Sequence, residues 1–122
     1  MTKVLVIEDE EILRESILNI LETNGFSAIG AADGRSGLQL AKEVVPDLIL
    51  CDVRMPELDG YEVLKALRQD PIAAEIPLLF LTAENIQRVV RQGEQLGANG
   101  YLTKPFSTAQ LLKAINQELR DR

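Results

Sequence analysis

Polar side chains that could do chemistry together stand at four places in the sequence. Glu8 and Asp9 form an acidic pair, and Asp52, Thr82 and Lys104 follow further along the chain. Carboxylates that are gathered at one place repel each other, so they favour either protonation or a bound cation. The chain contains no histidine, so any acid–base or metal chemistry has to use carboxylates, hydroxyls, lysine and backbone groups.

The elements that must position these residues alternate along the chain. Short apolar runs predict buried strands, and apolar residues at helical spacing predict amphipathic helices. The predicted strands cover residues 3–7, 26–31, 48–51, 77–81 and 101–102. The predicted helices lie around residues 13–21, 38–45, 63–67, 86–96 and 111–119. Asp33 and Gly34 are expected to form a turn, and Ser107 with Gln110 has the pattern of a capping box.

Strand–helix alternation of this kind predicts an α/β fold with a parallel sheet that helices cover on both faces. In such folds the ligand site lies beyond the carboxyl ends of the strands. The polar residues stand at those ends: Glu8 and Asp9 after the first strand, Asp52 after the third, Thr82 after the fourth and Lys104 after the fifth. We therefore expect them to meet at one edge of the sheet.

The residue types at this edge suit phosphoryl chemistry. Carboxylate oxygens without histidine or a cysteine cluster favour Mg2+, with Mn2+ as a substitute, over zinc. Lys104 supplies a point charge for a phosphoryl oxygen, and the hydroxyl of Thr82 can donate to another. A carboxylate can also act as a nucleophile and form an acyl phosphate.

Four motifs in this order resemble the receiver domains of bacterial two-component response regulators. They are Lys3-Val-Leu-Val-Ile-Glu-Asp, Leu50-Cys-Asp-Val-Arg-Met-Pro-Glu-Leu-Asp-Gly, Leu81-Thr-Ala and Tyr101-Leu-Thr-Lys-Pro-Phe. The resemblance spans residues 1–122 as one receiver domain. It implies a flavodoxin-like, doubly wound sheet of five parallel strands in the order 2-1-3-4-5, with about five helices on its two faces.

The resemblance also implies roles for the acidic residues. Asp52 would be the phosphoryl acceptor and would contribute to the metal site. Asp9 would bind Mg2+ directly, Glu8 would help through a water molecule, and the backbone carbonyl of Arg54 would complete the protein's ligands.

The remaining motif residues would respond to the phosphoryl group. By the resemblance, Thr82 moves toward it, Lys104 pairs with it, and Tyr101 is the aromatic that turns inward as Thr82 moves. Ala83 flanks the site, and the bond that precedes Pro105 is cis. This movement would switch the surface of the helix 86–96, the strand 101–102 and the helix 111–119, and so control a downstream output.

Two departures from the family pattern affect regulation. Arg54 and Glu84 each lie two residues beyond a site residue, and we hypothesise that they pair and shield the phosphoryl group from water. Asn99-Gly100 replaces the Asp-Asp that often precedes the switch aromatic in relatives that dimerise on DNA. The sequence therefore gives weaker support to a phosphorylation-dependent homodimer that forms through the switching surface.

Composition narrows the class of partner. The net charge of −6 disfavours direct binding of nucleic acid by this domain. One cysteine, no apolar run long enough to span a membrane and no signal-peptide pattern predict a cytoplasmic protein. With no histidine in the chain, the phosphoryl donor would be a histidine kinase or phosphotransfer protein acting in trans.

Three functions from different classes fit the residues. The first is a signalling receiver that catalyses only its own phosphorylation and dephosphorylation. The second is a phosphohydrolase that turns over through an aspartyl phosphate, but such enzymes carry a second aspartate where this chain has Arg54. The third is a phosphorylation-independent interaction module, which would not need the acidic pair, Asp52 and Lys104.

Overall fold

The computed structural model describes residues 1–83 and 86–120. The described residues form a single parallel sheet in the order β2-β1-β3-β4-β5. Its strands are β1 (Lys3–Ile7), β2 (Ser27–Ala31), β3 (Leu48–Asp52), β4 (Leu78–Thr82) and β5 (Gly100–Thr103). The predicted α/β class and strand order are confirmed.

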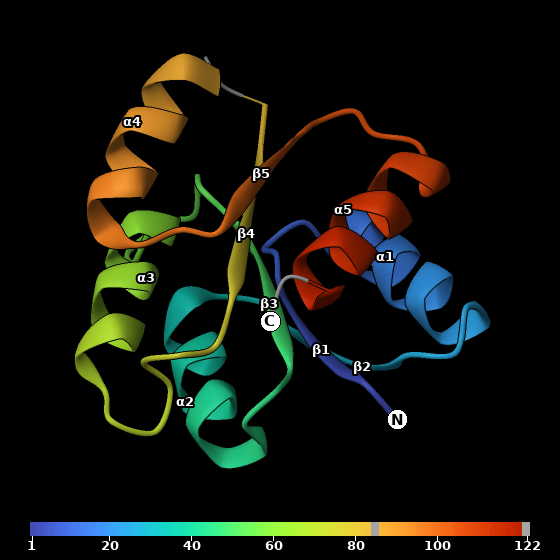
Figure 1. Ribbon diagram of the computed structural model, residues 1–122, viewed down its shortest axis with the longest axis horizontal. Helices are drawn as coiled ribbons and strands as arrows, with labels where there is room; N and C mark the ends of the chain where they lie inside the picture. Colours follow the sequence, from blue (N-terminus) through green and yellow to red (C-terminus); the bar gives the residue numbers. More distant parts are fainter. Residues whose placement is uncertain (84–85, 121–122) are drawn as a thin grey trace.

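The helices cover both faces of this sheet. They are α1 (Glu11–Thr23), α2 (Gly34–Val44), α3 (Gly60–Gln69), α4 (Ile86–Leu96) and α5 (Thr108–Arg120). Figure 1 shows α1 and α5 together on one side of the sheet and α2, α3 and α4 on the other. The buried apolar residues accordingly fall into two clusters, one beneath each group of helices.

The central strands are buried along their whole length. Every residue of β3 and β4 is buried, because these strands have neighbours on both edges and helices on both faces. A continuous apolar run is the sequence signature of such a strand. These strands thus form the rigid base from which Asp52 and Thr82 project.

Side chains at the helix starts fix where three helices begin. We expected Asp33 to form a turn with Gly34, but it is the N-cap of α2. Its carboxylate accepts a hydrogen bond from the Ser36 amide at 2.8 Å. Asp59 and Glu62 form a capping box at the start of α3. The predicted capping box at Ser107 is confirmed by two hydrogen bonds with Gln110, of 2.8 and 3.0 Å.

The end of α2 is a strained point in the backbone. Its C-cap, Val45, has φ 46° and ψ 69°, in the left-handed region that β-branched residues rarely adopt. The side chain is 47% exposed, so little packing compensates for the strain.

One arginine joins three segments at the amino end of the sheet. Arg68 of α3 donates to the carbonyls of Gly97, at 2.9 and 3.1 Å, and Ile76, at 2.8 Å. It also donates to the side-chain oxygen of Asn99 at 2.9 Å, and that oxygen accepts the amide of Leu78 as well. Asn99 is therefore committed to contacts inside the domain.

Candidate functional site

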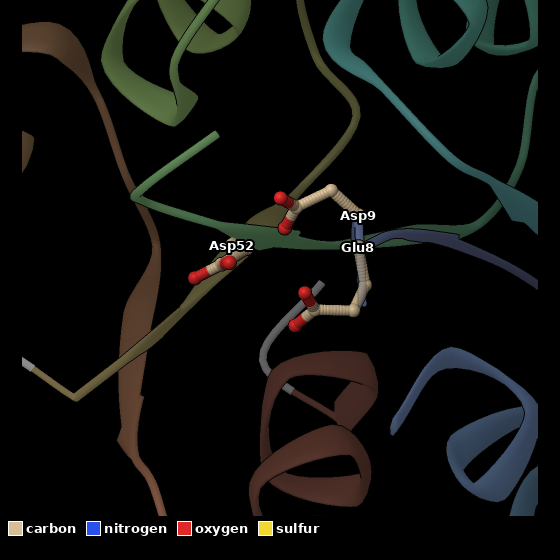
Figure 2. Close-up of side chains that lie close together, drawn as sticks. All are labelled: Glu8, Asp9 and Asp52. Atoms are coloured by element: carbon tan, nitrogen blue, oxygen red, sulfur yellow. The ribbon is translucent and has the colours of Figure 1, made fainter. Parts of the chain in front are cut away.

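The predicted acidic residues meet at the carboxyl edge of the sheet. Ile7 pairs with Cys51 across the sheet, so Glu8 follows directly beside Asp52. One carboxylate oxygen from each of Glu8, Asp9 and Asp52 lies within 4.8 Å of the other two. Figure 2 shows the three carboxylates pointing toward a common space, two from the end of β1 and one from the end of β3. The sequence-predicted acidic cluster is thus present as a spatial group.

Lys104 joins two of these carboxylates. Its Nζ lies 2.8 Å from Oε1 of Glu8 and 3.2 Å from Oδ1 of Asp52. Glu8 is only 1% exposed and Asp52 only 7%, whereas Asp9 is exposed. The second oxygen of Glu8 accepts the amide of Glu10 at 3.1 Å. Lys104 therefore neutralises the buried part of the cluster, while Asp9 faces solvent.

Partial desolvation makes Asp52 and Asp9 harder to ionise. Desolvation, followed by the charge of Glu8, raises the pKa of Asp52 to about 6, although Lys104 opposes the shift. Desolvation and a hydrogen bond with Glu8 also raise the pKa of Asp9. Burial alone would lower the pKa of Lys104, but its hydrogen bond with Glu8 and the charge of Asp52 leave that pKa above its ordinary value.

Thr82 stands one residue beyond the cross-strand neighbour of Asp52. Asp52 pairs with Leu81 in the sheet, and Thr82 is the last residue of β4, with 1% of its surface exposed. The carbonyl of Thr82 accepts the amide of Lys104 at 2.7 Å. Ala83, which follows, is exposed. Thr82 and Lys104 are therefore linked through the backbone of two neighbouring strands.

Tyr101 is half-buried beneath α4. Its hydroxyl donates a hydrogen bond to the carbonyl of Val90 at 3.0 Å, and its ring lies 6.2 Å from that of Phe80. Val90 was not among the predicted site residues, since a backbone acceptor leaves no mark in a sequence. The Lys104–Pro105 peptide bond is cis.

Arg54 lies in the loop that follows β3. It lines a cavity of about 310 Å³, whose wall also includes Asp59 and Tyr61 from the start of α3 and Arg88 from α4. This loop returns to the site, since the amide of Gly60 donates to the carbonyl of Val53 at 2.9 Å. Glu84, the expected partner of Arg54, lies outside the described residues.

The donor set fits a hard cation. Three carboxylates face one space, and at least two of them gain from a nearby positive charge, because burial and mutual repulsion oppose their ionisation. Oxygen-only ligands suit Mg2+, which keeps several waters and needs few protein ligands. The exposure of Asp9 leaves one side of the cluster open to solvent.

The fold and this site define a class of protein. Residues 4–116 match the family described as the response regulator receiver domain. The chain therefore belongs to the receiver domains of two-component response regulators, a signalling family that works by phosphorelay.

Individual relatives agree with this assignment. The alkaline phosphatase synthesis transcriptional regulatory protein PhoP of Bacillus subtilis is 41% identical over 118 residues, which cover 97% of this chain and 48% of the relative. The phosphate regulon transcriptional regulatory protein PhoB of Escherichia coli is 36% identical, with 97% and 52% covered. This chain thus spans about half the length of these curated relatives.

Solved structures support the fold. The chemotaxis protein CheY4 of Vibrio cholerae has a TM-score of 0.92 and 36% identity, covering 96% of this chain and 98% of its own. The receiver domain of the Francisella response regulator 1452 has a TM-score of 0.90 and 33% identity, with 99% and 98% covered.

Within residues 1–83 and 86–120, no helix has the length and apolar character needed to cross a bilayer.

Proposed function

We propose that residues 1–122 form one receiver domain, which accepts a phosphoryl group on Asp52 from a phosphohistidine of another protein. The observation that carries this proposal is the convergence of Glu8, Asp9, Asp52 and Lys104 at one edge of the sheet. Because the chain contains no histidine, the donor is a histidine kinase or a phosphotransfer protein.

The transfer needs positioning and charge neutralisation more than covalent machinery. An Asp52 oxygen forms a bond to phosphorus as the phosphorus–nitrogen bond of the donor breaks, and the departing imidazole takes its proton from solvent. Burial holds Asp52 in place, and a pKa of about 6 leaves it mostly ionised at neutral pH. Lys104, 3.2 Å from Asp52, and Thr82 at the next strand end would contact the phosphoryl oxygens.

A divalent cation completes this site in the proposal. Asp9, Asp52 and the backbone carbonyl of Arg54 would hold Mg2+, with Mn2+ as a substitute, and Glu8 would assist through water. The cation would supply positive charge to the phosphoryl oxygens. The exposed position of Asp9 supports its role as the ligand that first meets the ion from solvent.

Apolar surface beside the site is suited to docking the donor protein. Ile12 of α1 is 86% exposed, and a neighbouring pocket of about 310 Å³ is lined by Leu13, Ala83 and Lys104 together with Pro105 and Phe106. A phosphohistidine can reach Asp52 only if its protein rests on this edge of the sheet. Exposed apolar surface at that position favours a protein donor over a small phosphoester.

The phosphoryl group would then change the surface formed by α4, β5 and α5. Phosphorylation adds about −1.5 to −2 charges beside Thr82 and Lys104. Movement of these residues and of Tyr101 would alter that surface for an output domain or effector, or for a second copy of the chain. The relatives PhoP and PhoB are named as transcriptional regulators and are about twice as long, so DNA contact by an attached domain fits better than contact by this acidic one.

The direct test uses acetyl phosphate with Mg2+, followed by intact mass. The wild-type protein should gain one phosphoryl group, and Asp52→Asn should gain none. Asp47→Asn is the matched control, since Asp47 precedes β3 and Asp52 ends it, so this variant should behave like the wild type. Modification that persists in Asp52→Asn would contradict the acceptor assignment.

Three further measurements test the metal site, the alternative function and the role of Arg54. Asp9→Asn should lose the Mg2+ dependence of the phosphorylation rate. Repeated release of phosphate from small phosphoesters would instead favour the phosphohydrolase. Arg54→Asn should shorten the lifetime of the phosphoryl group, and an unchanged dephosphorylation rate would exclude a shielding role for Arg54.

A further inference from the structure

Helix α4 carries a glycine in its interior, where glycine weakens a helix. Gly93 is buried and lies within the span Ile86–Leu96. The glycines with positive φ among the described residues are Gly25 and Gly97. The backbone at Gly93 is therefore one that alanine could adopt, and the reason for glycine at this position must be space.

That space is filled by Tyr101. A Cβ built on Gly93 would lie 2.7 Å from the hydroxyl oxygen of Tyr101, 2.9 Å from its ring atom Cε1 and 3.2 Å from the Cβ of Ala98. Contacts below 3.0 Å are too close for carbon, so either the ring or the helix would have to move. Gly93 thus forms a notch in the inner face of α4.

The notch and a hydrogen bond together fix the ring. The hydroxyl of Tyr101 donates to the carbonyl of Val90, three residues before Gly93 and on the same face of the helix. Phe80 of β4 lies on the strand side, with its ring centre 6.2 Å away. Tyr101 is therefore held between α4 and β4, and its position depends on the missing side chain at Gly93.

The position of this ring is connected to the phosphoryl-acceptor site through the sheet. Phe80 pairs with Tyr101 and Thr82 pairs with Thr103, so β4 and β5 are in register up to the site. Lys104, the residue after β5, donates its amide to the carbonyl of Thr82. Tyr101 lies in β5, and Lys104 directly follows this strand. A change in how Tyr101 contacts α4 therefore acts on the strand that leads to Lys104.

We propose that Gly93 is a positioning residue for Tyr101: its lack of a side chain keeps the ring docked under α4, and a methyl group there expels the ring. The effect of Gly93 on signalling rests on the proposed function, in which movement of Tyr101 alters the surface formed by α4, β5 and α5. Alanine at this position raises the helix propensity of α4, which stabilises the domain. Its methyl group also displaces the ring of Tyr101, which destabilises the domain, so the two effects on stability have opposite signs. This opposition makes the proposal testable.

The first test observes the ring directly. The chain contains two tyrosines, so protein labelled with 3-fluorotyrosine should give two fluorine resonances, which Tyr61→Phe assigns. Gly93→Ala should shift the Tyr101 resonance toward that of an exposed tyrosine. Gln95→Ala, at an exposed position of α4, adds helix propensity away from the ring and should leave the resonance in place. An unmoved Tyr101 resonance in Gly93→Ala would overturn the proposal.

The second test is a double-mutant cycle followed by urea unfolding. In a Tyr101→Ala background the ring is gone and the Cβ of Ala98, at 3.2 Å, is the remaining close contact, so Gly93→Ala should raise the unfolding midpoint through helix propensity. In the wild-type background the same substitution should raise the midpoint less, or lower it. Equal effects in the two backgrounds would show that Gly93 does not act through Tyr101.

The third measurement separates this proposal from the proposed function. Intact mass after treatment with acetyl phosphate should show that Gly93→Ala accepts a phosphoryl group like the wild type. Any phosphorylation-dependent shift of the Tyr101 resonance should be lost in this variant, because the ring has already left its docked position under α4. If the wild type is not phosphorylated, the proposed function fails while the first two tests still decide the role of Gly93. A shift as large in Gly93→Ala as in the wild type would refute the coupling.

Discussion

The charge on Asp52 should lower the stability of the domain in the absence of a divalent cation. Burial and the charge of Glu8 raise the pKa of Asp52 from 3.8 to about 6. The folded domain therefore holds this proton more tightly than the unfolded chain does. Stability from the protonated carboxyl is complete below pH 3.8 and is lost as the pH rises through about 6.

The size of this effect follows from the shift. Each pKa unit corresponds to about 1.4 kcal/mol, so ionisation of Asp52 lowers the free energy of unfolding by about 3 kcal/mol at neutral pH. Asp52→Asn removes the charge and keeps a side chain of similar size. This variant should equal the wild type in stability below pH 3.8 and exceed it by about 3 kcal/mol above neutrality.

The assay is urea unfolding followed by circular dichroism across this pH range, with a chelator present. Glu15→Gln is the control, since Glu15 is an exposed carboxylate on α1, and its difference from the wild type should not follow the same pH profile. Added Mg2+ should stabilise the wild type more than Asp52→Asn, because a cation that binds only the folded state raises stability. A difference between wild type and Asp52→Asn that stays constant with pH would refute the reasoning.

Three substitutions outside the site test the fold. Val45→Gly should stabilise the domain by about 1 kcal/mol, because glycine adopts the left-handed conformation without strain; a lower urea midpoint would contradict this. Arg68→Lys should cost about 3 kcal/mol of unfolding free energy, since a lysine cannot reproduce the fork that reaches Gly97, Ile76 and Asn99 together; near-wild-type stability would show that these bonds contribute little. Asp59→Ala removes the capping box of α3 and should cost about 1 kcal/mol, while Asp59→Asn should recover most of it.

The elements could be predicted from the sequence because their patterns are local. The strands were placed to within about two residues, since β3 and β4 are continuous apolar runs buried on both faces. The start of α2 was placed too late, because Asp33-Gly34 is common to turns and to helix caps. The order of the strands depends on contacts between distant segments, and it came from the family resemblance instead.

The site was predictable as a set of residues but not as a set of contacts. Parallel strands bring their carboxyl ends together, which is enough to gather Glu8, Asp9, Asp52 and Lys104. The sequence did not indicate which carboxylates Lys104 would contact, because that depends on the side-chain conformations at the edge of the sheet. The Val90 carbonyl was missed for a different reason, since any residue type provides a backbone acceptor.

Lys104 connects the charge at the site to the strand that holds Tyr101. Its ammonium group is shared between Glu8 and Asp52, and its backbone amide is bonded to Thr82. A phosphoryl group on Asp52 would bring new charged oxygens that compete with the two carboxylates for the same ammonium group, since all of these bonds are charge-assisted. Because Lys104 directly follows β5, a change of partner acts on the strand that carries Tyr101. The partly buried Glu8–Lys104 pair is therefore part of the resting state from which a switch would have to start.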